Sequence, residues 1–138
     1  MRGALDALAA RLAAQQREQL DAKLIERGRK AARGRNVQAM IEADAAFHNA
    51  VYAAARNPLI PRSAHLHWAH IRRAMGAVLQ ASTQREAVWD EHEAIAQAIA
   101  AGDAARAEQL MREHDARASE HITRHLDAAI GAEARSNA

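Results

Sequence analysis

The chain has 138 residues, which is the size of a single domain with its own hydrophobic core. It contains no cysteine, which excludes disulfide frameworks, thiolate zinc sites and cysteine nucleophiles. Its 19 basic residues, 17 of them Arg, are offset by 17 acidic residues, and a formal net charge of +2 is a weak field for binding nucleic acid. No segment resembles a membrane span or a signal peptide, so we expect a cytoplasmic protein.

Alanine dominates the composition with 38 copies, and prolines number two, so helix is favoured along most of the chain. Apolar spacing and the Gly, Pro and Asn signals predict six helices, at about residues 4–16, 17–33, 36–56, 63–81, 84–101 and 104–130. Gly34 and Gly102 are expected as C-caps, and Asn36 and Asp103 as N-caps. We therefore predict an all-α antiparallel bundle in one domain, residues 1–138, with a tail that frays from about residue 131.

The densest basic segment lies at the end of the second predicted helix and contains Arg27, Arg29, Lys30, Arg33 and Arg35. Such a segment is either a phosphate-binding patch or a solvated helix end. We favour the helix end, because basic residues suit helix C-termini and no aromatic residues interleave with these for base stacking.

Four polar residues fall on the apolar faces of three predicted helices. Asp44 and His48 lie four residues apart within the apolar arc of the third helix, so their side chains stack one turn from each other. His92 lies near the centre of the apolar stripe of the fifth helix, and His114 lies within that of the sixth.

The length of the last hairpin predicts that His92 and His114 meet. They are 22 residues apart, and their midpoint is residue 103, in the predicted turn. In an antiparallel hairpin each histidine therefore lies about 15 Å from the turn, at the same height as the other.

An aspartate and three histidines are costly to bury without partners, and a divalent cation removes that cost. Neutral imidazoles and a carboxylate suit zinc, nickel or a similar ion, and four such ligands leave coordination positions open. The alternative is a hydrogen-bonded polar core in which the histidines bind Asp44 or backbone carbonyls. The four residues together favour the metal site.

Other polar residues are weaker candidates for a site. Among the three histidines around the fourth helix only His67 approaches its inner face, and we expect surface or rim positions for the group, His65, His67 and His70. His121 and His125 follow His114 on the same stripe and are expected to line a cavity or pack between helices. Arg72 borders the inner face of the fourth helix, where it would either grip an anionic ligand or form a structural ion pair.

Several segments of the chain together resemble the FCD domain, the effector-binding C-terminal domain of the FadR subfamily of GntR transcription regulators. The segments are D44-A-A-F47-H48, A55-R-N57-P, I71-R72-R73, E91-H92-E-A-I95-A-Q-A98-I99-A-A-G102-D103 and M111-R-E-H114. They occur in order and at suitable spacing, and the resemblance extends to about residue 128.

The resemblance implies a bundle with a central cavity that holds a metal and a ligand. In the metal-binding branch of the family, the metal would be held by Asp44, His48, His92 and His114, with zinc expected first and nickel or manganese as alternatives. A small organic acid would bind with its carboxylate near the metal, and the residues expected to contact this effector are Arg72, His67, His121 and Asn57. The resemblance also implies a homodimer that reaches DNA only through a separate winged-helix domain, which this sequence does not include.

The sequence thus predicts an effector-sensing module and not an enzyme. One alternative is a small helical metallohydrolase that uses the His₃Asp metal to activate water. Against it, Glu91, Glu113 and Asp115 lie off the inner arcs, so no second carboxylate is placed as a general base. A second alternative is a structural bundle in which the four polar residues form a hydrogen-bond network.

Overall fold

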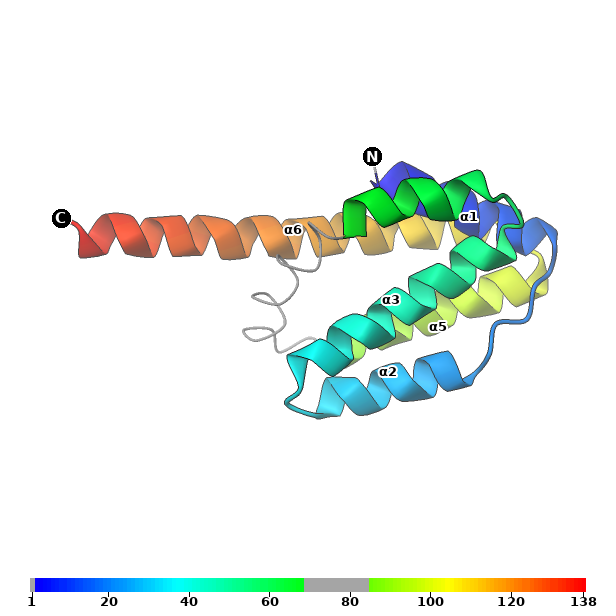
Figure 1. The fold of residues 1–138 in the computed structure, drawn as a ribbon, viewed down its shortest axis with the longest axis horizontal. Coiled ribbons are helices and arrows are strands. Elements are labelled where there is room, and N and C mark those ends of the chain that lie inside the picture. The colour runs from blue at the N-terminus through cyan, green and yellow to red at the C-terminus, as the bar shows by residue number, and fades with distance from the viewer. Residues whose placement is uncertain (1, 69–84) are drawn as a thin grey trace.

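A computed structural model of the chain describes residues 2–68 and 85–138 (Figure 1). The described residues form helices and no strand, which confirms the all-α prediction. The helices are α1 (Arg2–Gln15), α2 (Lys23–Arg33), α3 (Val37–Ala54), an unlabelled helix at residues 59–68, α5 (Arg85–Ala101) and α6 (Ala104–Ser136). The remainder of the predicted fourth helix, with His70 and Arg72, lies outside the described residues.

The helices pack into a bundle around α3 and α5. Helix α2 packs on both of these, α1 packs on α3, α5 and α6, and α5 and α6 pack together near the turn that joins them. Figure 1 shows α5 and α6 running in opposite directions and diverging away from that turn, and Phe47 of α3 stacks on His92 of α5. The core therefore lies where α1, α3, α5 and the first half of α6 meet.

The predicted caps position the helices that carry the polar residues. The Asn36 side chain accepts a hydrogen bond from Ala39 N at 3.2 Å at the start of α3, and Asp103 accepts one from Arg106 N at 3.1 Å at the start of α6. Gly102 has a φ of +75°, a left-handed conformation that glycine adopts without steric cost. These features confirm the predicted starts of both helices and the turn of the hairpin.

The predicted start of the second helix is wrong by about one and a half turns. Arg17 has a φ of 52°, which ends the helical path after α1, and α2 begins only at Lys23. The carboxylate of Asp21 accepts a hydrogen bond from Lys23 N at 2.9 Å, so a local side-chain acceptor fixes the later start.

Helix α1 buries mainly alanines, with Leu5 and Leu12 partly buried against the core. Leu8 is 44% exposed, whereas Ala7, Ala10 and Ala14 are fully buried. Small side chains let two helices approach closely, which suits the packing of α1 against α6. Asp6 is also fully buried.

Helix α6 is longer than predicted and continues to Ser136 instead of ending near residue 130. Its last residues, Ala132, Glu133, Ala134 and Arg135, are strong helix formers, which explains the continuation. The buried residues of α6 all lie at or before His114, and its second half projects from the bundle (Figure 1). Among the described residues, no helix is both long enough and apolar enough to span a membrane.

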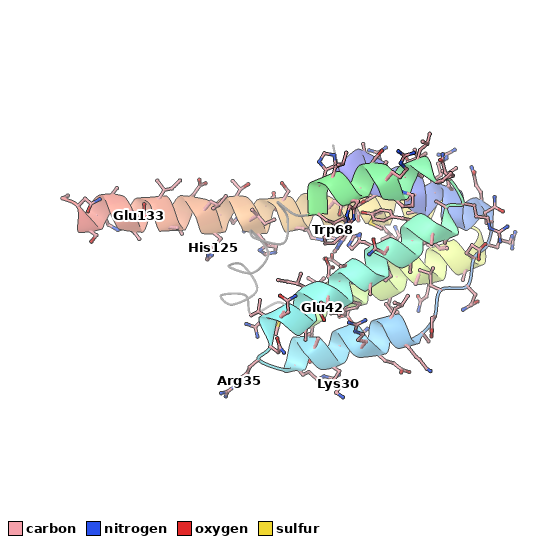
Figure 2. All side chains as sticks on the ribbon, viewed as in Figure 1. Lys30, Arg35, Glu42, Trp68, His125 and Glu133 are labelled. Carbon is pink, nitrogen blue, oxygen red and sulfur yellow. The ribbon has the colours of Figure 1, made fainter. Side chains whose placement is uncertain are left out.

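The basic segment of α2 is partly neutralised by α5. Arg29 donates to Asp90 at 2.8 Å and to Glu93 at 2.6 Å, and Arg33 donates to Glu86 at 2.9 Å. Lys30 and Arg35 instead point away from the bundle (Figure 2). This pairing of Arg29 and Arg33 supports a charged helix end that packs on α5.

Gly28 lets α2 approach α5 at one point. A Cβ atom built on Gly28 would lie 2.1 Å from the ring of Trp89, closer than two carbon atoms can approach. The indole of Trp89 therefore lies directly against the backbone of α2, which explains a glycine within a helix.

Candidate metal centre

The four polar residues singled out in the sequence lie together in the bundle. Asp44 and His48 come from α3, His92 from α5 and His114 from α6. All four are buried, and one ligand atom from each lies within 4.8 Å of the others. The prediction that three helices bring these side chains together is confirmed.

The atoms that converge have the spacing that a metal ion requires. Nε2 of His92 lies 3.2 Å from Nε2 of His114 and 3.4 Å from Oδ1 of Asp44. The same Asp44 oxygen lies 3.6 Å from Nε2 of His48. Adjacent donors around an ion with bonds of about 2.0–2.1 Å are about 3 Å apart, so these three separations are compatible with a divalent cation held by this donor set.

The charge of Asp44 is stabilised inside the protein. Burial alone would raise the pKa of its carboxyl, but the charge and hydrogen bonding of His48, together with the charges of His92 and His114, outweigh it and hold this pKa well below its usual range. Asp44 is therefore an ionised carboxylate at neutral pH, which is the form that binds a cation.

A second buried carboxylate, Asp6 of α1, lies on the far side of His48. Its Oδ2 atom lies 3.5 Å from Nδ1 of His48, and the hydroxyl of Tyr52 donates a hydrogen bond to its Oδ1 atom. The sequence reasoning did not identify Asp6. The sequence does contain a signal for a special role of Asp6, because it is the one polar side chain between Arg2 and Arg11.

A third carboxylate, Glu91, binds the outer nitrogen of His114. Glu91 Oε2 lies 2.6 Å from Nδ1 of His114, and Arg117 Nε donates to the other oxygen, Oε1, at 2.7 Å. Burial would raise the pKa of Glu91, but the hydrogen bond and charge of His114, with those of Arg117, lower it. Glu91 lies off the inner arc of α5, as predicted, but it contacts the site because α6 covers the flank of α5 on which Glu91 lies.

Aromatic rings surround the histidines. Phe47 stacks on His92 with ring centroids 4.2 Å apart and an angle of 18° between the planes, and Trp89 packs edge-on against His92 at 4.5 Å. Trp68 packs against His48 with centroids 5.7 Å apart. These rings restrict the orientation of both imidazoles.

The residues expected to bind the effector are less closely grouped. His67 is partly buried in the helix at residues 59–68, and His121 is partly exposed two turns beyond His114 on α6. The side chain of Asn57 accepts a hydrogen bond from Leu59 N at 3.1 Å, so its oxygen is engaged at a helix start. Arg72 lies outside the described residues, and the effector contacts of all four remain predictions.

The other candidate histidines lie apart from the four. His65 is exposed, and His125 is partly exposed on the projecting part of α6. A cavity of about 380 Å³ lies between α2, α3 and α5, and Phe47, which stacks on His92, forms part of its wall. None of the four candidate ligands lines this cavity.

The model of the FCD domain family matches residues 1–117, which is most of the chain, so the chain belongs to the FCD family. The matched region includes the four candidate ligands and the carboxylates Asp6 and Glu91. No curated protein matches the chain. FCD domains are the effector-sensing domains of GntR-family transcription regulators, and the bundle described here is such a domain.

Proposed function

We propose that this domain senses a small organic acid with the help of a bound divalent metal ion. Asp44, His48, His92 and His114 would hold the ion, with zinc first among the candidates and nickel or manganese as alternatives. The observation that carries the proposal is the convergence of these buried ligand atoms to within 4.8 Å of one another.

The bound ion would supply positive charge and open coordination positions for a carboxylate of the effector. Arg72, His67, His121 and Asn57 are the residues proposed to contact the rest of the effector. Because the ligands come from α3, α5 and α6, metal and effector together would bias how these helices pack.

We further propose that the domain works within a homodimeric, cytoplasmic regulator. Binding of the effector would shift the population of bundle arrangements, and this shift would change DNA binding by a separate winged-helix domain. The effector-binding domain would contact DNA only through that winged-helix domain.

Sensing is favoured over the alternative of a metallohydrolase by the position of Glu91. Its carboxylate binds Nδ1 of His114, on the opposite side of the ring from the Nε2 atom that faces the cluster. A general base for a metal-bound water would have to lie on the Nε2 side. Glu91 therefore acts on a ligand and not on a substrate.

The first experiment is elemental analysis of the purified protein, with thermal melts before and after chelation. We expect about one ion per chain, a lower Tm after chelation, and recovery on addition of zinc. His114→Ala should lose the ion, whereas the control His125→Ala should keep it. A metal-free protein whose melt ignores zinc, nickel and manganese would reduce the four residues to a polar network.

The second experiment tests effector binding by calorimetry with a panel of small carboxylic acids. We expect at least one acid to bind the metal-loaded protein and to lose affinity after chelation. Full affinity in the chelated protein would contradict the role of the metal. Turnover of a carboxylic ester that disappears in His92→Ala would favour the hydrolase.

A further inference from the structure

We propose that Asp6 and Glu91 are positioning residues of the metal centre. Each carboxylate would hold one ligand histidine at its Nδ1 atom, so that the Nε2 atom presents its lone pair to the metal. This inference rests on the proposed metal centre and extends it to two residues that are not ligands themselves.

The contact of Glu91 determines which nitrogen of His114 carries the proton. An ionised carboxylate only accepts hydrogen bonds, so at a separation of 2.6 Å the proton lies on Nδ1 of His114. In the neutral imidazole, Nε2 of His114 is then the unprotonated nitrogen, and this atom lies 3.2 Å from Nε2 of His92. The tautomer that can bind a metal is therefore fixed from outside the cluster.

Asp6 faces His48 from a different helix, at a longer distance than the hydrogen bond between Glu91 and His114. Its Oδ2 atom faces Nδ1 of His48 at 3.5 Å, while Nε2 of His48 faces Asp44 at 3.6 Å. The two nitrogens of one ring thus face two carboxylates, one on each side. Only the Asp44 side belongs to the cluster of ligand atoms.

Each positioning carboxylate is itself held by a donor on its second oxygen. Tyr52, one turn after His48 on α3, donates its hydroxyl proton to Asp6, and Arg117, nearly one turn after His114 on α6, donates to Glu91. In both cases the donor lies on the same helix as the histidine, and the carboxylate comes from a neighbouring helix. Each carboxylate therefore links the helix that carries it to the helix that carries the ligand histidine.

Loss of such carboxylate–histidine contacts weakens metal binding by about 10- to 100-fold in general, because the ring loses its fixed orientation and some basicity. We expect a loss of this size for Asp6→Asn and for Glu91→Gln. Tyr52→Phe should give a smaller loss, because it removes the donor behind Asp6 and leaves the carboxylate in place.

The experiment titrates each variant with zinc against a competing chelator and records the absorption spectrum of the cobalt-loaded protein. The matched control is Glu108→Gln, because Glu108 accepts hydrogen bonds from Arg11 and Arg112 and contacts no ligand histidine. We expect weaker zinc binding and a changed cobalt spectrum in the two carboxylate variants, and neither change in the control. Equal zinc affinity in Asp6→Asn, Glu91→Gln and the unchanged protein would overturn the inference.

A second measurement uses the metal-free protein and depends on neither metal binding nor effector. Nitrogen-15 NMR of the imidazole rings should show His48 and His114 protonated at Nδ1, and this preference should be lost in Asp6→Asn and Glu91→Gln respectively. Rings protonated at Nε2 in the unchanged protein would overturn the inference even if metal binds. If no metal binds although His48 and His114 are protonated at Nδ1, the proposed metal-dependent function is wrong. The inferred role of Asp6 and Glu91 in metal binding is then wrong as well.

Discussion

Nε2 of His92 and Nε2 of His114 lie 3.2 Å apart, although the two residues are separated by 22 positions in the chain. The turn at Gly102 and Asp103, midway between them, determines this meeting. Gly102 takes a left-handed conformation, and Asp103 caps the helix that follows. Each histidine lies several helical turns from this point. A small change in the angle between α5 and α6 at the turn would therefore produce a larger displacement of the two imidazole rings.

Substitution of Gly102 should therefore affect stability and metal binding together. We expect Gly102→Ala to lower the free energy of unfolding by about 1–2 kcal/mol, since a left-handed φ of +75° is unfavourable for alanine. Urea unfolding measures this loss, and zinc affinity should fall with it. Gly34→Ala is the control, because a φ of −86° at Gly34 suits alanine. Equal losses in both variants would contradict a special role for the turn.

Substitution of Gly28 should be destabilising for a steric reason. A methyl group at this position would overlap the indole of Trp89, and overpacking of this kind costs typically about 1–3 kcal/mol. The same indole packs on His92, so zinc affinity should also fall.

The matched control for Gly28→Ala is Gly131→Ala, in the projecting part of α6. A Cβ atom there would meet only the end of the Arg135 side chain at 3.6 Å, so alanine should stabilise the helix by about 0.5–1 kcal/mol. Urea unfolding of both variants gives the comparison. A stabilising Gly28→Ala would show that Trp89 does not lie against α2.

Acid should destabilise the metal-free protein in part through Glu91. The folded state holds the pKa of Glu91 below its ordinary value of 4.5, so the unfolded state binds more protons as the pH falls. The contribution of Glu91 to stability is complete above about pH 4.5 and is lost as the pH falls through the lower, folded-state pKa. Urea unfolding from pH 6 to pH 3 should therefore bring Glu91→Gln closer to the unchanged protein, whereas a constant difference would contradict this.

The four candidate ligands could be predicted because their signals are local or follow from one hairpin. Asp44 and His48 share a helix face through their spacing of four, and His92 and His114 are related by the length of the hairpin alone. The caps at Asn36 and Asp103 are equally local, since each side chain binds the backbone three residues ahead.

The positioning carboxylates depend on tertiary packing that no helix pattern contains. Glu91 follows the flank of α5, about 100° around the helix from His92, and only the placement of α6 makes that flank part of the site. Asp6 reaches His48 because alanines let α1 pack closely into the bundle. The later start of α2 has a local cause instead: the left-handed φ of Arg17 and the Asp21 carboxylate, which accepts a hydrogen bond from Lys23 N.

The two tryptophans of the chain, Trp68 and Trp89, both pack against candidate ligands, so the protein carries its own optical reporter of the metal centre. Ions with unpaired d electrons, such as nickel or cobalt, should quench the intrinsic emission when bound, whereas zinc should leave it bright. A stopped-flow fluorimeter could then follow ion entry and exchange in real time without any attached dye. His92→Ala should remove the nickel-dependent quenching, and quenching that persists in this variant would place the ion elsewhere.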